Sequence, residues 1–181
     1  MSPMRVIGLL SGTSTDGIDA ALVEIRGRGL RARLRLLAFE TLSYPPGLRG
    51  EIMGLTHESR SEELCRLNFY LGELFARAAK GIARKARVSL KSVDLIGSHG
   101  QTICHLPRPK RMRGIAVRST LQIGEPSVIA ERTGVTTVAE FRYRDLAAGG
   151  EGAPLTPYLH YILFHHSRRS RLVVKIGRAH V

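Results

Sequence analysis

A run of small and polar side chains follows the first apolar segment of the chain. Apolar runs at 5–10 and 18–25 flank it, so it connects two predicted strands. Consecutive backbone N–H groups in such a turn form a concavity that binds anions, and glycines let the main chain approach a ligand closely. Asp16 is suited to hold Mg²⁺ or its waters. The candidate phosphate-binding residues are Gly12, Thr13, Ser14, Thr15, Asp16, Gly17, Ile18 and Asp19.

An ordinary turn is the alternative interpretation of this run, because Asp-Gly is a common dipeptide in β-hairpins. The segment lacks the Gly-Lys-Ser/Thr that opens a helix in the Walker-type loop, and a strand is expected to follow it instead. It resembles the hairpin phosphate loop of the actin, Hsp70 and sugar-kinase superfamily.

A second group of polar side chains, at 98–102, comes directly after a short buried strand expected at 93–97. Ligands of open α/β sheets bind beyond the carboxyl ends of strands. His99 and Gln101 therefore offer hydrogen bonds to a sugar or an amide. The alternative is a capped strand end with a satisfied histidine.

Arg142 and Arg144 follow another expected strand, at 136–139. In extended chain both side chains would project to one side, and arginine forks bind carboxylates and phosphates bidentately. A surface ion pair with Asp145 or Glu140 is the alternative, although exposed pairs contribute only about 0–1 kcal/mol. For Glu125 we favour a structural role at the start of a helix.

Composition limits the class of protein. The 181 residues suffice for one or two compact domains, and 43% are hydrophobic. The net charge of +13 is spread along the chain without interleaved aromatic residues, which disfavours a nucleic-acid partner and favours steering of anionic substrates. We find no membrane span, no signal peptide and no disulfide or metal pattern in the two cysteines, so we expect a cytoplasmic protein.

The order of expected elements indicates an α/β fold with a mixed sheet and flanking helices. Three strands of an antiparallel meander come first, at 5–10, 18–26 and 34–42, and a helix follows at 61–86. The later elements are strands at 93–97, 121–123, 136–139 and 171–176, helices at 127–133 and 155–166, and a basic loop at 107–118. This order resembles one ribonuclease-H-like half of an actin-type kinase.

Four motifs stand in register with one known family. Gly-Leu-Leu-Ser-Gly-Thr-Ser-Thr-Asp-Gly-Ile-Asp, Gly-Ser-His-Gly-Gln-Thr-x-x-His, Gln-Ile-Gly-Glu-Pro and Phe-Arg-Tyr-Arg-Asp-x-Ala-Ala-Gly-Gly-Glu-Gly-Ala-Pro-Leu occur in this order between about 6 and 164. They resemble the anhydro-N-acetylmuramic acid kinases of peptidoglycan recycling. Two residues depart from the family pattern: Glu140 stands where Asp is usual, and Glu151 where Gln is usual.

The resemblance implies an ATP- and Mg²⁺-dependent sugar kinase. Such an enzyme hydrolyses the 1,6-anhydro ring of anhydro-N-acetylmuramic acid and phosphorylates O6, giving N-acetylmuramic acid 6-phosphate. It implies that the run 12–19 binds the ATP phosphates, with Asp16 towards the metal, and that His99, Gln101, Arg142 and Arg144 contact the sugar and its lactyl carboxylate. Arg144 is also expected to neutralise charge on the transferring phosphoryl group. The family also suggests a homodimer when complete.

The resemblance further implies that the chain holds only an N-terminal half. The general-base Asp is expected in a Phe-Asp-x-Gly-Pro-Gly-Asn segment that this sequence does not contain. We expect an actin-like domain over 1–170, the start of a second domain at 171–174, and a non-native tail at 175–181, whose last six residues, from Ile176, match a translated sequencing adapter. Such a half is expected to be inactive alone. The alternatives are another sugar or acyl kinase of the superfamily and a basic module that binds anions or nucleic acid.

Overall fold

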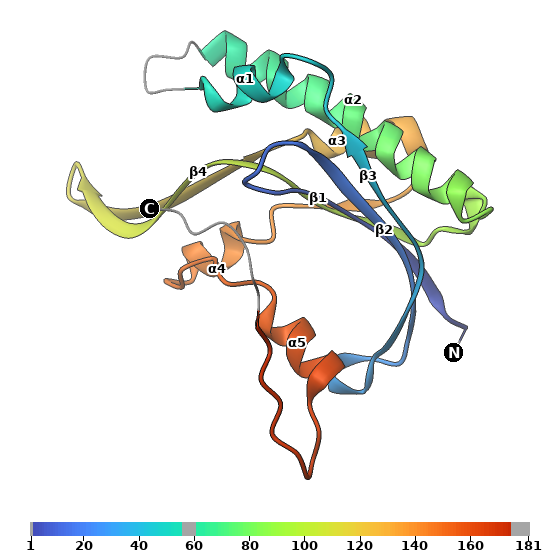
Figure 1. Cartoon of the computed structure of the whole chain (residues 1–181). Coiled ribbons are helices and arrows are strands. Elements are labelled where there is room, and N and C mark those ends of the chain that lie inside the picture. Colours follow the sequence, from blue (N-terminus) through green and yellow to red (C-terminus); the bar gives the residue numbers. More distant parts are fainter. Residues whose placement is uncertain (1, 56–60, 175–181) are drawn as a thin grey trace.

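A single sheet organises the molecule (Figure 1). The computed structural model describes residues 2–55 and 61–174, so the tail expected at 175–181 lies outside the described residues. Within these ranges the sheet has six strands: β1 (Met4–Ser11), β2 (Gly17–Arg26), β3 (Arg33–Ser43), β4 (Leu95–Met112), β5 (Ile115–Ile123) and β6 (Thr137–Val138). The first three strands were all predicted from the sequence, with ends within two residues of those observed.

The sheet is mixed, as predicted. Strands β1, β2 and β3 form an antiparallel meander, whereas β4 runs parallel to β1 and β6 runs parallel to β4. The first part of β4 lies between β1 and β6, and its remaining length pairs with β5 in an antiparallel ribbon. The carboxyl ends of β1, of the first part of β4 and of β6 therefore meet at one edge of the sheet.

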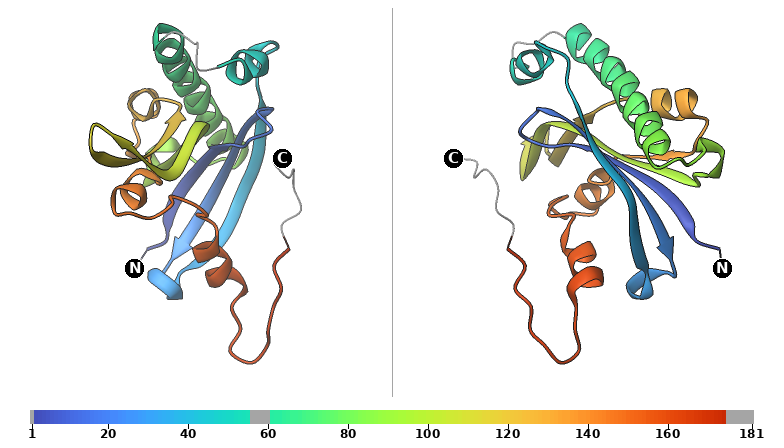
Figure 2. Two further views of the ribbon diagram at one scale, coloured as in Figure 1. Left: turned by 90° about the vertical axis from the view of Figure 1, so that its left-hand side faces the viewer. Right: turned by 45° about the vertical axis from the view of Figure 1, so that its right-hand side comes forward.

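Helices cover both faces of the sheet (Figures 1 and 2). The helices α1 (Leu48–Met53), α2 (Ser61–Lys85) and α3 (Pro126–Thr133) lie on one face, and α4 (Tyr143–Ala147) and α5 (Pro157–Phe164) lie on the other. Short 3₁₀ turns occur at Gly29–Arg31 and Leu90–Ser92. None of the described helices is both long enough and apolar enough to cross a membrane.

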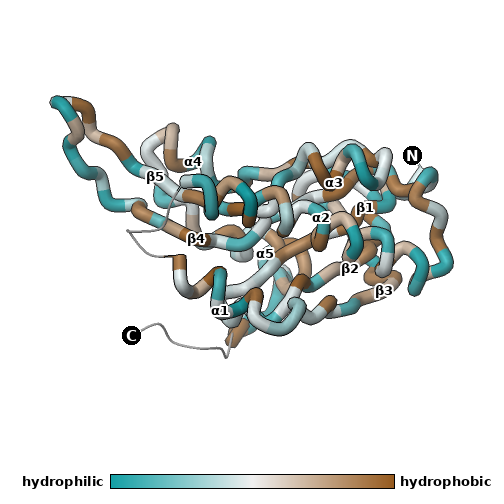
Figure 3. Tube along the Cα trace, turned by 90° about the horizontal axis from the view of Figure 1, so that it is seen from above, coloured by the Kyte–Doolittle hydropathy of each residue, from teal (hydrophilic) through white to brown (hydrophobic). Residues whose placement is uncertain are grey.

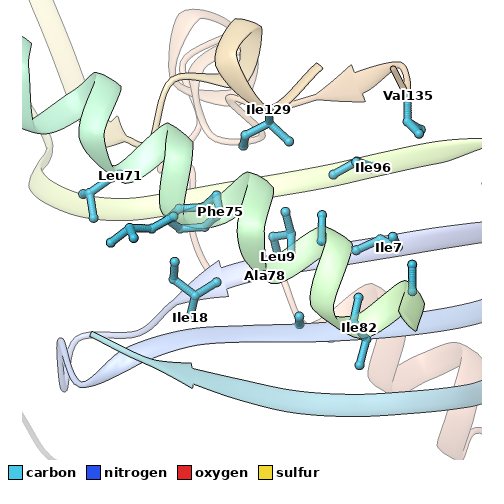
Figure 4. Packing of buried hydrophobic residues seen from close by; sticks show 14 of the residues in the cluster. Ile7, Leu9, Ile18, Leu71, Phe75, Ala78, Ile82, Ile96, Ile129 and Val135 are labelled. Atoms are coloured by element: carbon cyan, nitrogen blue, oxygen red, sulfur yellow. The ribbon is translucent and has the colours of Figure 1, made fainter. Parts of the chain in front are cut away.

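The main core lies between α2 and the sheet (Figure 4). Apolar residues recur along α2 at three- and four-residue steps, which places them on one face of the helix. That face packs against alternate residues of β1, β2 and β4, and each fully buried aliphatic or aromatic side chain contributes about 1.5–3 kcal/mol. The fully buried members with the largest side chains are Phe75, Ile7, Ile18, Leu22, Leu71, Ile82, Ile96 and Ile129.

The expectation of a basic loop at 107–118 is wrong. This segment forms the end of β4 and the start of β5, which pair as a two-stranded ribbon. Two prolines, Pro107 and Pro109, led to that expectation. They lie where the β4–β5 register shifts between Leu106 and Lys110, on a part of β4 that no other strand flanks, so their missing N–H groups cost little there. Hydrophilic and hydrophobic positions are mixed along this projecting ribbon (Figure 3).

The C-terminal expectations are confirmed in part. The helix expected at 155–166 forms as α5, although none of its residues is buried. The expectation of a strand at 171–176 is wrong for residues 171–174, which belong to no strand. Residues 175 and 176 lie outside the described residues.

Candidate functional site

The tip of the β1–β2 hairpin is a tight turn held by its own polar groups. The N–H of Thr15 donates to the carbonyl of Gly12 across 3.1 Å, and Thr15 adopts a left-handed φ of 53°. Ser14 Oγ donates to Asp16 Oδ1 across 2.8 Å. Thr15 is 4% exposed, whereas Thr13, Ser14 and Asp16 are exposed at the tip. The turn therefore presents two hydroxyls and one carboxylate to solvent.

The tip carries groups of the kinds that bind an anion and a metal ion. Within the described residues, no other group accepts the N–H of Thr13 or of Ser14, so both can donate to a ligand. Asp16 is the only carboxylate at the tip, and no group of three or more His, Cys, Asp or Glu in the described ranges could hold a metal ion by itself. Mg²⁺ commonly binds through one or two carboxylates plus substrate phosphates, and one carboxylate beside phosphate donors fits that pattern.

The two glycines of the turn have different roles. A Cβ on Gly17 would lie 2.5 Å from the carbonyl oxygen of Leu42, so the close approach of β3 requires glycine there. A Cβ on Gly12 would meet nothing nearer than Ser14 Oγ at 3.8 Å, and its φ is not left-handed. Contacts within the described chain therefore leave Gly12 open to a ligand.

Two predicted phosphate-binding residues have side chains committed to the fold. Ile18 is fully buried in the core, so only its main chain faces the turn. Asp19 accepts a hydrogen bond of 2.6 Å from Thr41 Oγ1 on β3. The structure thus gathers the accessible part of the predicted loop into residues 12–16.

Gln101 is a buried support for this hairpin. Its Oε1 accepts a hydrogen bond of 2.5 Å from Ser11 Oγ, and its Nε2 donates to the carbonyl of Thr102. Both Ser11 and Gln101 are 2% exposed. This placement favours a positioning role over the direct sugar contact expected for Gln101, and it joins the end of β1 to β4.

Tyr44 packs beneath the same turn. Its N–H donates to the carbonyl of Asp16 across 3.1 Å. Its hydroxyl is buried beside Ser11 without a hydrogen bond of good geometry in the described chain. Burial, and to a smaller extent the charge of Asp16, raise the pKa of Tyr44. The phenol therefore stays protonated below the turn.

His99 and Arg142, predicted from separate motifs, are in direct contact. Arg142 Nε donates to His99 Nε2 across 3.0 Å, and Arg142 Nη1 donates to the carbonyl of Gly152 across 2.7 Å. Because His99 Nε2 accepts, the ring proton is on Nδ1, which lies 3.2 Å from the carbonyl oxygen of Gly100. Burial, together with the positive charge of Arg142, holds the pKa of His99 below its usual value. The imidazole is therefore neutral at physiological pH.

The expectation that Arg142 and Arg144 project from extended chain on one side is wrong. Arg142 immediately precedes α4 and Arg144 lies within it, so the chain turns between them. Arg142 uses two of its nitrogens within the protein, whereas the guanidinium of Arg144 is exposed and has no hydrogen bond or ion pair among the described residues. Arg144 is thus the guanidinium available to an anionic ligand.

A glycine-rich loop after α4 is held by two residues that sequence reasoning did not assign to the site. Asp145 Oδ2 accepts from the N–H of Gly152 across 2.7 Å, and Arg118 Nη1 donates to the carbonyl of Gly150 across 3.2 Å. Between these glycines Glu151 is exposed, so its additional negative charge faces solvent. Asp145 follows Arg142 by three residues and lies in the first turn of α4, and that spacing was the available signal.

Glu125 has the structural role that the sequence favoured. It caps α3 by accepting from the N–H of Ser127 across 3.0 Å, and it also accepts from Asn68 Nδ2 on α2 across 3.1 Å. The Ser127 hydrogen bond is the main cause that lowers the pKa of Glu125. Glu140, which stands where Asp is usual in the family pattern, is exposed and has a left-handed φ of 59°.

Comparison with known proteins assigns the family. Residues 4–180 match the family described as Anhydro-N-acetylmuramic acid kinase. The chain belongs to this family. A protein of that name from Caldanaerobacter subterraneus subsp. tengcongensis is 53% identical over 174 residues, which are 95% of this chain and 44% of the relative. One from Bacillus cereus (strain ATCC 10987) is 47% identical over 176 residues, 96% of this chain and 45% of the relative.

The chain spans a little under half the length of these anhydro-N-acetylmuramic acid kinases. Every motif on which the resemblance rested lies within the matched residues. In this chain the motifs lie on the β1–β2 turn, on β4, at the end of β5 and in the segment around α4.

Proposed function

We propose that this chain supplies the phosphate-binding and part of the sugar-binding surface of an ATP-dependent kinase that acts on anhydro-N-acetylmuramic acid. The reaction would hydrolyse the 1,6-anhydro ring and phosphorylate O6, giving N-acetylmuramic acid 6-phosphate. The observation that carries the proposal is the β1–β2 turn, where the N–H groups of Thr13 and Ser14 have no acceptor among the described residues and lie beside the Asp16 carboxylate. Family membership supports the choice of phosphoryl donor and sugar.

Positioning and charge stabilisation account for most catalysis of phosphoryl transfer. The turn would hold the ATP phosphates through main-chain N–H groups and the hydroxyl of Thr13, because the Ser14 hydroxyl donates to Asp16. Asp16 would hold Mg²⁺, which supplies charge neutralisation when bound. Arg144, exposed and unpaired in the described chain, would face the sugar's carboxylate or the transferring phosphoryl group.

The sugar would meet the edge of the sheet where β4 and β6 end. Neutral His99 is held there by Arg142, and the Ser11–Gln101 hydrogen bond fixes this edge relative to the phosphate turn. Location in the cytoplasm and assembly as a homodimer belong to the same proposal.

Binding of ATP tests the nucleotide part. We expect titration calorimetry of the chain to show Mg²⁺-dependent ATP binding that Asp16→Asn weakens at least tenfold. Glu51→Gln, which removes an exposed carboxylate on α1, should leave the affinity unchanged and serves as the control. Equal affinities for Asp16→Asn and the unsubstituted chain would contradict the metal role of Asp16.

A further inference from the structure

A cavity of about 300 Å³ lies beside the sheet edge, apart from the phosphate turn. It is bounded by the first turns of α2, by β4 around Ser98, by the end of β5 and by the residues that lead into α3 and α4. Its volume is at the lower end of small-molecule sites, which span roughly 300–1,000 Å³. None of residues 11–19 lines it.

Ser98 contributes a buried hydroxyl that has no partner among the described residues. The residue is 1% exposed, and no hydrogen bond within the described chain uses its Oγ. Leaving a buried polar group unpaired costs about 1–3 kcal/mol, so such a group calls for an explanation. An alanine would fit the same place on β4 without that cost.

Gln122, on β5, adds an acceptor of fixed orientation to the cavity lining. Its Nε2 donates to Thr120 Oγ1 across 2.8 Å, and Thr120 Oγ1 in turn donates to the carbonyl of Cys104. Because the hydroxyl hydrogen of Thr120 is used on Cys104, its oxygen must accept, which fixes the amide nitrogen of Gln122 on that side. Gln122 Oε1 is therefore an acceptor, buried and without a partner in the described chain.

The charges around the cavity select against anions. Among the described residues that line it there is no Lys or Arg, whereas the carboxylates of Glu125 and Glu140 are present. His99, which also lines it, is neutral and accepts through Nε2. An acceptor such as Gln122 Oε1 requires an O–H or N–H on the ligand, which an ionised carboxylate lacks.

We infer that this cavity receives the uncharged part of the sugar, its ring hydroxyls or its acetamido N–H. Gln122 Oε1 accepts from one such group, and Ser98 Oγ hydrogen-bonds to the same ligand. The anionic part of the substrate stays outside the cavity, on the side of Arg144. This inference rests on the proposed function for the identity of the ligand as a sugar, and it assigns specificity to Ser98 and Gln122.

The test uses two probes of opposite character, N-acetylglucosamine and D-lactate, added to the ¹⁵N-labelled chain and followed by NMR. We expect saturable shifts for residues around Ser98 and Gln122 with N-acetylglucosamine but not with D-lactate. Ser98→Ala and Gln122→Met should each weaken N-acetylglucosamine binding at least fivefold. Ser119→Ala, an exposed hydroxyl change on β5 outside the cavity, should bind as the unsubstituted chain does.

Stability provides the second readout. A hydroxyl kept for a ligand is dispensable to the fold, so Ser98→Ala should have an unfolding midpoint at or above that of the unsubstituted chain. Unchanged sugar binding in both cavity variants, saturable D-lactate binding there, or no N-acetylglucosamine binding at all would overturn the inference. Asp16→Asn should keep full sugar binding, so a failure of the nucleotide proposal would be seen separately.

Discussion

Arg142 Nε donates to His99 Nε2 across 3.0 Å, a hydrogen bond that only an uncharged imidazole can accept. Burial is the main reason that the pKa of His99 is low, and the guanidinium charge lowers it further. Arg142→Met removes that charge and that donor while keeping a long side chain. We expect the pKa of His99 to rise, as measured by NMR titration of its imidazole carbons. Arg144→Met, which removes a charge without a contact to His99, is the control, and a pKa that falls in Arg142→Met would contradict the assignment.

His99 also makes stability depend on pH. Its folded-state pKa lies below the ordinary 6.5, so just below pH 6.5 the unfolded chain binds more protons than the folded chain. The free energy of unfolding should therefore decrease as pH falls from 7.5 through 6.5 to 5.5. His99→Gln should remove part of this decrease, as measured by urea unfolding at each pH. The carboxylates with lowered pKa, Glu24, Glu73 and Glu125, act only below about 4.5 and leave this window clear.

The buried Ser11–Gln101 hydrogen bond should be visible as a coupling energy. Ser11→Ala leaves Gln101 Oε1 buried without its partner, and such a loss costs about 1–3 kcal/mol. Gln101→Met should be similar in cost, and the double variant should cost less than the sum of both. Urea unfolding of the four proteins gives the cycle, and strictly additive losses would show that the hydrogen bond contributes nothing.

Gly12 and Gly17 should respond in opposite ways to alanine. At Gly17 the added Cβ would collide with the main chain of Leu42, so we expect a loss of several kcal/mol in the free energy of unfolding, of the order seen for overpacked sites. At Gly12 the Cβ has space, so stability should be kept while ATP affinity falls. Thermal unfolding and ATP titration of both variants check this, and unchanged ATP affinity in Gly12→Ala would remove Gly12 from the phosphate site.

The elements that were predicted most accurately from the sequence are those that depend on short-range apolar periodicity. The three-stranded meander and α2 follow from alternating and three- to four-residue apolar spacing, and their observed ends differ little from those expected. The capping role of Glu125 was predictable for the same reason, because it depends only on Glu125 and on the Pro-Ser pair that follows it.

What the sequence could not show depends on contacts between distant segments. Pro107 and Pro109 indicate a loop by composition, and only pairing with β5 turns that segment into a strand. The burial of Gln101 depends on Ser11, ninety positions earlier in the chain, and the contact of His99 with Arg142 spans 43 positions. Local propensity carries no information about such partners, so Gln101 was expected to face a ligand and instead faces the interior.

The position of β1 has a consequence for how its turn meets a ligand. This strand is hydrogen-bonded along its length to β2 on one side and to β4 on the other, and Ser11 ends it next to the turn. The main chain that leads into the turn is thus immobilised when the domain folds, and its amides should be among the slowest to exchange with deuterium. The backbone donors of the turn are then already oriented before an anion binds, so the chain loses little conformational entropy on binding.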